Sequence, residues 1–294
     1  MDTAQGRDGQ HRLRDGRMLG YTEYGRSDGS PVFYFHGFPS SRLEARLADS
    51  AAARAGVRLI AVDRPGFGLS DFKRGRTLGD WPDDVVELAD ALWLKRFAVL
   101  GVSGGGPYAA ACAWKIPQRV SAAGIVCGLG PVDSPRAVQG LSRALRLGFF
   151  LLRRARVLVG PFCRIATWAV RRHTQGFYAR VAATVAAPDQ AVLARPEVQE
   201  TLVQSFREAV YHGAAACARE LRLYSRHWGF ELRDVSARVY LWHGEHDRIV
   251  PCAVGRYVAQ SIPGCHARFY PDDGHYSLPV ERMEEILAEL LTSR

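Results

Sequence analysis

The chain has 294 residues, of which 47% are hydrophobic and 23% charged, a balance typical of a folded globular protein and not of a disordered one. It contains no apolar run near the roughly 18 residues that a membrane-spanning helix needs, and its polar N-terminal segment does not resemble a signal peptide. The net charge of +9 is concentrated, because residues 134–188 contain ten arginines and no acidic residue, while the remainder of the chain sums to −1.

The six cysteines are widely scattered, with no Cys-x-x-Cys pair and no spacing typical of a zinc site. This pattern favours buried free thiols in a reducing compartment over a disulfide framework. We therefore predict a cytoplasmic protein without a metal site.

Short apolar runs predict strands at residues 11–19, 21–24, 32–35, 57–62, 97–102, 121–129, 239–242 and 267–270. Asp15-Gly16 is a hairpin signal within the first of them. Segments with helical spacing lie between most of the later runs, at residues 42–55, 82–94, 109–116, 252–261 and 281–291. Strands that alternate with helices predict an α/β fold with a mainly parallel sheet flanked by helices.

This alternation stops near residue 133 and resumes only near residue 238. The intervening segment has helical patterns separated by turn signals such as Gly160-Pro161 and His212-Gly213. We predict a core domain formed by residues 1–132 and 236–294, and an inserted all-helical cap domain formed by residues 133–235.

The run at residues 97–102 leads directly into Gly101-Val102-Ser103-Gly104-Gly105, a Gly-x-Ser-x-Gly pattern followed by a helical segment. Small residues on both sides of Ser103 permit a sharp turn between a strand and a helix. A serine held at such a turn is exposed beside a helix N-terminus, where negative charge is favoured. The pattern predicts a nucleophilic serine.

A serine nucleophile needs a base and a carboxylate that orients the base. In a parallel sheet these groups gather beyond the carboxyl ends of the strands. Asp247 and His275 each follow a predicted strand, as Ser103 does, and the order Ser, Asp, His is that of the α/β hydrolases. Asp133 also follows a strand and is the second candidate for the acid. We expect His36 to brace the neighbouring loop.

Four blocks of sequence together resemble the α/β-hydrolase superfamily, in particular its esterase-like members with a serine nucleophile and a helical cap. The blocks are His36-Gly37-Phe38-Pro39, residues 63–70, residues 101–108, and residues 243–251 with Gly274-His275. They occur in the expected order and cover most of the chain outside the cap. The resemblance implies an α/β-hydrolase fold.

The resemblance also implies roles for individual residues. Ser103 would attack the substrate carbonyl, His275 would accept and return the proton, and Asp247 would hold the imidazole. The backbone N–H groups of Phe38 and Gly104 would form the oxyanion hole. The side chains assigned to substrate binding are Phe38, Tyr108 and Phe149.

These roles describe a cofactor-free serine hydrolase, a carboxylesterase that forms an acyl-enzyme with small or medium acyl esters. Haloalkane dehalogenases and soluble epoxide hydrolases of this fold use an aspartate where this chain has Ser103, so their chemistry is excluded. Hydrolysis of a carbon–carbon bond, a lactone or a thioester by the same triad stays open. So does a binding protein with the hydrolase fold and negligible turnover.

The arginine-rich segment at residues 134–188 has two interpretations. Its arginines are solvated or paired with the acidic residues of 197–231, or they form a basic amphipathic surface that docks weakly on anionic membranes. No nucleic-acid recognition module accompanies the charge, so we expect no nucleic-acid partner. The oligomeric state has no signal in the sequence.

Overall fold

A computed structural model of the chain describes residues 6–132, 143–154 and 156–292; the side chains of residues 143–145, 149, 153 and 156 lie outside that description. Its centre is an eight-stranded sheet with the strand order β1-β2-β4-β3-β5-β6-β7-β8. The strands are β1 Arg7–Arg12, β2 Met18–Gly25, β3 Ser30–Phe35, β4 Val57–Val62, β5 Phe97–Val102, β6 Val120–Val126, β7 Val239–Gly244 and β8 His266–Tyr270. β2 runs antiparallel to β1 and β4, and the other pairs are parallel, so the predicted fold class is confirmed.

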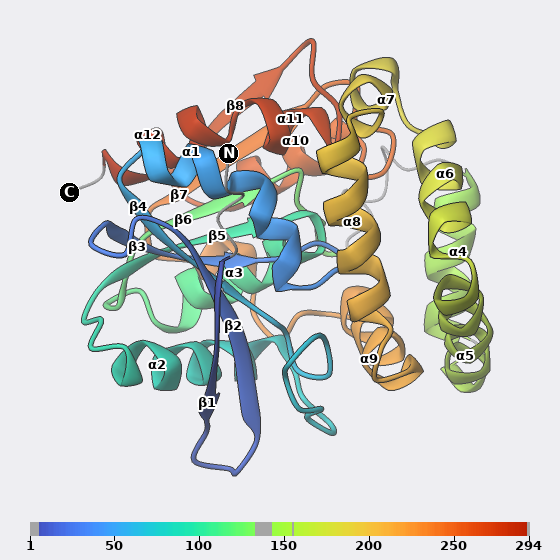
Figure 1. The fold of residues 1–294 in the computed structure, drawn as a ribbon, viewed down its shortest axis with the longest axis horizontal. Coiled ribbons are helices and arrows are strands. Elements are labelled where there is room, and N and C mark those ends of the chain that lie inside the picture. The colour runs from blue at the N-terminus through green and yellow to red at the C-terminus, as the bar shows by residue number, and fades with distance from the viewer. Residues whose placement is uncertain (1–5, 133–142, 155, 293–294) are drawn as a thin grey trace.

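Helices cover both faces of the sheet (Figure 1). One face packs against α1 Asp49–Arg54 and α12 Met283–Leu291, and the other against α2 Trp81–Ala91, α3 Gly106–Lys115 and α10 Cys252–Ser261. On β3, Val32 and Tyr34 belong to the first core, whereas Phe33 and Phe35 belong to the second. Side chains alternate along a strand, so a strand covered on both faces is a continuous apolar run.

Several predicted elements end at different residues in the structure. The helix expected at 42–55 is a 3₁₀ helix, η1 Arg42–Ala48, followed by α1. The closing helix expected at 281–291 is α12, and a short helix that was not expected, α11 Ser277–Glu281, precedes it. The strand expected at 121–129 ends at Val126, because Cys127 adopts a positive φ of 48° that turns the chain away from the sheet. A left-handed residue cannot continue an extended strand.

In the described part of the chain, six α-helices lie between β6 and β7, and we call them the cap helices. They are α4 Arg143–Arg154, α5 Arg156–Arg172, α6 Thr174–Thr184, α7 Ala187–Leu193, α8 Pro196–Ala209 and α9 Ala214–Tyr224. They stand together beside the sheet (Figure 1). After α9, Trp228 and Phe230 return to the main core. The predicted domain boundaries stay a prediction. No helix of the described residues has the length and hydropathy required to cross a membrane.

Candidate active site

Ser103 lies at a sharp turn between β5 and α3, where the sequence predicts it. Its φ of 53° is in the left-handed region, which is unfavourable for a residue with a side chain and is tolerated where the surroundings enforce it. A Cβ on Gly105 would collide with the carbonyl oxygen of Phe35, and one on Gly101 with that of Gly105. The flanking glycines therefore permit two backbone segments to pass almost in contact at the turn.

The structure brings Ser103, His275 and Asp247 together from the carboxyl ends of β5, β8 and β7. The Oγ of Ser103 lies 3.0 Å from Nε2 of His275, and Nδ1 of His275 lies 2.7 Å from Oδ2 of Asp247. The other carboxylate oxygen of Asp247 accepts the backbone N–H groups of Ile249 and Val250, each at 2.8 Å. These contacts fix the carboxylate, which in turn orients the imidazole.

The electrostatics of the pair favour an ionised Asp247 and a basic His275. Burial alone would raise the pKa of Asp247, but the neighbouring His275 and His243 outweigh it and hold that pKa below its usual range. Burial alone would lower the pKa of His275, but the charge and hydrogen bond of Asp247 outweigh it and raise that pKa. The imidazole is therefore a stronger proton acceptor than a free histidine.

The backbone near Phe38 and Gly104 faces the serine. The N–H of Gly37 donates to the carboxylate of Glu44 at 3.0 Å and is already occupied. The N–H of Phe38 has no acceptor among the described residues, and its nitrogen lies 3.3 Å from the position that a Cβ on Gly104 would take. The Gly104 carbonyl accepts the hydroxyl of Tyr224 at 2.9 Å. Phe38 and Gly104, the residues expected to supply the oxyanion donors, thus lie side by side.

A buried charge cluster braces the loop at His36. The guanidinium of Arg64 donates to the carbonyls of His36 and Gly37, the latter at 2.8 Å, and its Nε lies 3.4 Å from Glu220 of α9. Burial would raise the pKa of Glu220, but Arg76 and Arg64 outweigh it and lower that pKa. A cap carboxylate thus neutralises the arginines that hold the oxyanion loop.

Tyr108 is part of that cluster, which corrects its expected role in substrate binding. Its side chain is fully buried. Its hydroxyl donates to Glu220 at 2.6 Å and accepts a hydrogen bond from Arg76 at 2.6 Å. It does not line the pocket beside Ser103, because its ring packs against Trp81 and the guanidinium of Arg64. The side chain of Phe149 and all of Asp133 lie outside the described residues.

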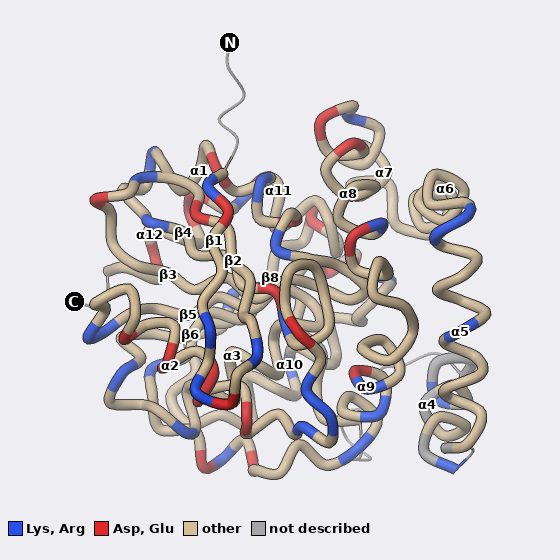
Figure 2. The backbone as a smooth tube through the Cα atoms, turned by 60° about the horizontal axis from the view of Figure 1, so that its bottom comes forward, with Lys and Arg blue, Asp and Glu red and all other residues tan. Residues whose placement is uncertain are grey.

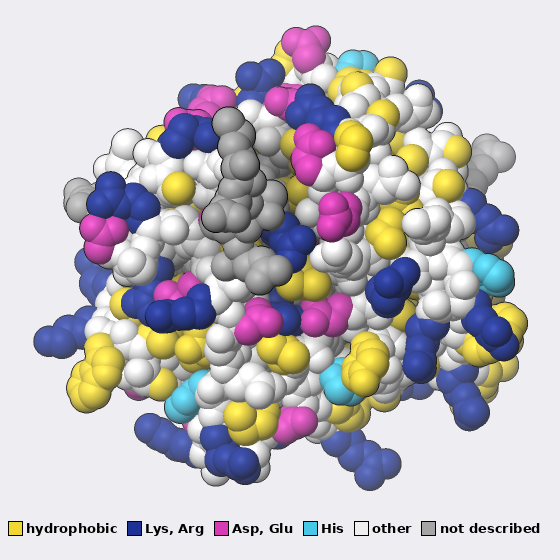
Figure 3. Space-filling view, viewed as in Figure 1, with side chains coloured by type: hydrophobic (Ala, Val, Ile, Leu, Met, Phe, Trp, Pro, Cys, Tyr) yellow, Lys and Arg dark blue, Asp and Glu magenta, His cyan; other side chains and the backbone are white. Residues whose placement is uncertain are grey.

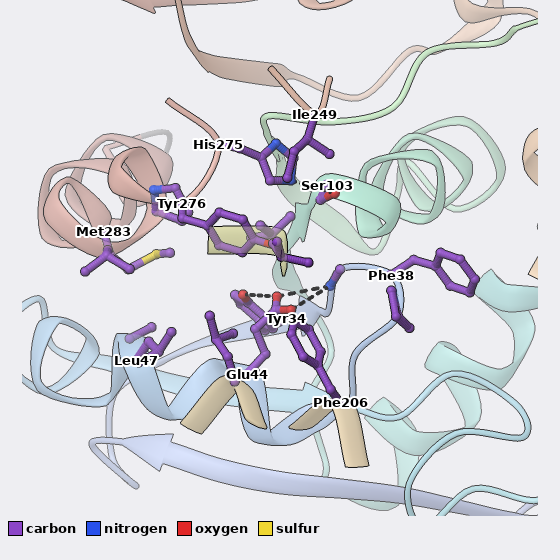
Figure 4. A pocket seen from close by; sticks show the side chains of 18 of the residues that line it. Tyr34, Phe38, Glu44, Leu47, Ser103, Phe206, Ile249, His275, Tyr276 and Met283 are labelled. Atoms are coloured by element: carbon purple, nitrogen blue, oxygen red, sulfur yellow. Dashed lines mark hydrogen bonds between the residues drawn. The ribbon is translucent and has the colours of Figure 1, made fainter. Parts of the chain in front are cut away.

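A pocket of about 210 Å³ opens beside Ser103 and His275. Its wall is mainly apolar and includes Phe38 together with Leu47, Phe177, Val181, Leu202, Phe206, Ile249, Val280 and Met283. Glu44 is an unexpected member of the wall, and the hydroxyl of Tyr34 donates to it at 2.8 Å (Figure 4). Glu44 has no motif of its own; its only signal in the sequence is a charge shortly after the oxyanion segment.

Asp189 of α7 is a second residue that sequence reasoning missed. It is fully buried, and its carboxylate accepts the backbone N–H groups of His275, Tyr276 and Ser277 at 2.9, 2.8 and 2.8 Å. A Cβ on Gly274 would collide with this carboxylate, so the glycine before the histidine lets the cap approach. A cap helix thereby holds the backbone of His275.

Ser205 of α8 makes the corresponding contact with the oxyanion loop. Its Oγ accepts the N–H of Ser41 at 2.9 Å and lies 2.8 Å from the Oγ of Ser40. Both catalytic loops are therefore attached to cap helices through buried polar groups.

Cys127, His243 and Asp247 are the one group of possible metal ligands among the described residues. The donor set does not fit a metal ion. Burial raises the pKa of the Cys127 thiol well above its usual range, which keeps it protonated, whereas a metal binds the thiolate. Nε2 of His243 lies 2.8 Å from the Val250 carbonyl, and Asp247 is already bonded to His275.

The family model described as "alpha/beta hydrolase fold" matches residues 30–281. A non-heme chloroperoxidase of Streptomyces lividans is 36% identical over 120 residues, 40% of this chain and 44% of its own. A bifunctional esterase/perhydrolase of Acinetobacter calcoaceticus is 24% identical over 287 residues, 95% of this chain and 96% of its own.

An esterase from Exiguobacterium antarcticum superposes with a TM-score of 0.71 over 98% of both chains at 20% identity, a likeness of fold alone. The matches cover less than half the length of the first curated relatives.

Proposed function

The chain belongs to the alpha/beta hydrolase family, and from that premise we propose that it is a serine hydrolase that cleaves carboxylic esters. The observation that carries the proposal is the continuous series of hydrogen bonds from Ser103 through His275 to Asp247. The names of two similar proteins, an esterase/perhydrolase and an esterase, support it.

In the proposed reaction the Oγ of Ser103 attacks the ester carbonyl carbon while its proton moves to Nε2 of His275. The carbonyl π electrons move to oxygen, where the N–H groups of Phe38 and Gly104 stabilise the negative charge. Loss of one such donor typically costs about two to three decades in rate. The tetrahedral intermediate expels the alkoxide, which takes the proton from His275, and an acyl-enzyme remains.

Water completes the cycle by the same route. His275 removes a proton from water as the hydroxide adds to the acyl carbon, and Ser103 leaves with that proton. Asp247 stays ionised throughout and stabilises the imidazolium that forms twice in each turnover. The steps need no metal or cofactor.

The size and lining of the pocket favour substrates with short, uncharged acyl groups. Its volume of about 210 Å³ accommodates a small acyl chain, and most of its wall is apolar. The carboxylate of Glu44 contacts the N–H of Gly37 beside the serine, so an acyl group that carries its own carboxylate would meet a like charge. We place the protein in the cytoplasm, since all six cysteines are free thiols, as that compartment favours.

The test is covalent labelling with a fluorophosphonate, which reacts with activated serines, followed by hydrolysis of p-nitrophenyl esters of increasing chain length. We expect labelling of the wild type, none of Ser103→Ala, and the fastest turnover with acetate or butyrate esters. A wild type that does not label would overturn the catalytic proposal. Labelling without ester hydrolysis would replace the ester with another acyl or carbon–carbon substrate.

A further inference from the structure

The outer face of α5 is apolar and uncovered by any described residue. Eight of the twelve large apolar side chains that are exposed in the described part of the chain lie on α4 and α5. On α5 they are Val157 (82% exposed), Leu158 (61%), Phe162 (59%), Ile165 (69%) and Trp168 (59%). On α4 they are Leu147, Phe150 and Leu151. A monomeric protein rarely leaves so many large apolar groups together without a partner.

The spacing of the apolar residues shows that α5 has two apolar faces, one packed against the protein and one exposed. Val159, Cys163 and Val170 recur at helical intervals and pack in one buried cluster with Phe67. The exposed residues occupy the opposite side of the same helix. A helix that is apolar on both sides needs an apolar environment on both sides.

Arginines border the apolar face. Arg164, Arg171 and Trp168 line a hollow beside α9, and Arg164 also lines the neighbouring hollow with Arg74 and Arg219. No acidic residue lines either hollow in the described part of the chain. The edge of the molecule near α5 and α6 shows basic and hydrophobic side chains without acidic ones in the view of Figure 3. The backbone in Figure 2 likewise carries Lys and Arg but no Asp or Glu along α5 and α6.

These arginines are not neutralised within the described chain. Arg154, Arg164, Arg171, Arg172 and Arg180 are exposed and make none of the ion pairs between described residues. Arg172 instead lies over the ring of Trp168, 5.8 Å from its centroid, and Arg154 lies 5.7 Å from that of Phe150. The charge therefore faces solvent beside the apolar groups.

We propose that the outer face of α5, extended by α4, docks on the surface of an anionic lipid bilayer. Aromatic and aliphatic groups enter the boundary between headgroups and acyl chains, while the arginines bind the lipid phosphates. A second copy of this chain fits less well, because it would bring two clusters of arginines together without acidic partners. The inner face of α5 packs near Phe38 and Phe177 of the pocket, so docking places the cap between the membrane and the pocket.

The test is sedimentation of the full chain with vesicles of phosphatidylserine and phosphatidylcholine, compared with vesicles of phosphatidylcholine alone. It uses no substrate and so does not depend on the proposed reaction. We expect binding to the anionic vesicles at low salt and release at high salt. Each basic residue near an anionic surface contributes about a fivefold change, so Arg164→Gln, Arg171→Gln and Arg172→Gln together should weaken binding by about a hundredfold.

A matched pair of variants tests the apolar contribution. Trp168→Ala should weaken binding at least tenfold, whereas Trp93→Ala, which removes a still more exposed tryptophan (92%) just after the core helix α2, should not change it. Thermal unfolding checks that each variant is folded. Absence of binding to anionic vesicles at low salt, or equal binding of the wild type and the triple variant, would overturn the proposal. A dimer that Trp168→Ala dissociates, without vesicle binding, would assign the face to a second copy and also overturn it.

Discussion

The inner and outer sides of the cap helices have opposite polar chemistry. On the inner side each carboxylate has a buried partner: Asp189 holds the backbone at His275, Glu208 pairs with Arg42, and Glu220 pairs with Arg64 and Arg76. On the outer side, arginines such as Arg164 and Arg171 stand among apolar groups and have no acidic partner in the described part of the chain. The buried carboxylates of the cap helices thus point to the core, whereas the exterior carries the arginines of α5 together with the exposed Glu197 and Glu200 of α8.

This difference bears on the pairing of the cap arginines. The acidic residues within 197–231 were one set of expected partners for the cap arginines, but the structure gives Glu208 and Glu220 to arginines of the core. These two carboxylates are therefore not partners of the arginines on the outer side of the cap. A buried polar contact fixes geometry, whereas an exposed charge mainly attracts a partner.

The largest expected effect of breaking the inner side is on stability. Among the described residues, Glu220 is the one carboxylate paired with Arg64 and Arg76, so Glu220→Gln leaves two buried arginines without that counter-ion. Loss of one partner of a buried ion pair typically costs about 3 to 5 kcal/mol. We expect the midpoint of thermal unfolding to fall by roughly 6 to 12 °C.

The outer control is Arg171→Gln, which removes an exposed charge. Surface substitutions usually change the free energy of unfolding by no more than about 0.5 kcal/mol, so its midpoint should stay within roughly 2 °C of the wild type. Equal shifts for the two variants, measured by circular dichroism, would show that the two sides of the cap do not differ as described.

The sequence predicts the chemistry at the strand ends better than the contacts of the cap. Ser103, Asp247 and His275 each follow an apolar run, and parallel strands necessarily bring their carboxyl ends to one edge. Tyr108 lies only five residues after Ser103, yet it points away from the pocket into the charge cluster. Its environment depends on Glu220, which lies 112 residues further along the chain. A local sequence pattern cannot predict a contact between residues so far apart.

Asp189 illustrates the same limit. Pro188-Asp189 is typical of the start of a helix. Nothing in the neighbouring sequence predicts that Asp189 contacts the loop at His275. A glycine is required at position 274 because the carboxylate of Asp189 approaches it closely. The sequence alone shows Gly274 only as a loop residue. Contacts between the inserted cap and the core are set by tertiary packing and not by periodicity.

The second prediction concerns Asp189 as a positioning residue, and it has an intermediate expected effect. Its carboxylate accepts four donors, the three amides and the hydroxyl of Ser277, and the amide of Asp189→Asn would direct N–H groups at some of them. A misplacement of about 1 Å in a catalytic group can cost about a hundredfold in rate. We expect kcat for p-nitrophenyl acetate to fall about ten- to a hundredfold with KM little changed.

The pH profile distinguishes positioning from a general loss of folding. Asp247 and, to a smaller degree, Asp189 raise the pKa of His275, so kcat/KM of the wild type should fall as the pH drops through a value above 6.5. Removing the charge of Asp189 should lower the pKa of His275, so that the imidazole remains neutral at lower pH. The acid limb of the kcat/KM profile should therefore move to lower pH. Glu197→Gln, which neutralises an exposed cap carboxylate, should leave kcat and the limb unchanged. An unaltered limb in Asp189→Asn would contradict the assigned role.

The smallest expected effect concerns Glu44, the charge on the core side of the pocket. Glu44→Gln keeps an oxygen acceptor for the N–H of Gly37 and the hydroxyl of Tyr34 but removes the negative charge. Two like charges near a partly exposed site repel by about 1 to 2 kcal/mol, so kcat/KM for a p-nitrophenyl hemisuccinate should rise roughly tenfold. The neutral butyrate ester of similar length should change less than about twofold, because it carries no charge for Glu44 to repel. An equal change for both esters would mean that Glu44 shapes the loop at Gly37 and does not select the acyl group by charge.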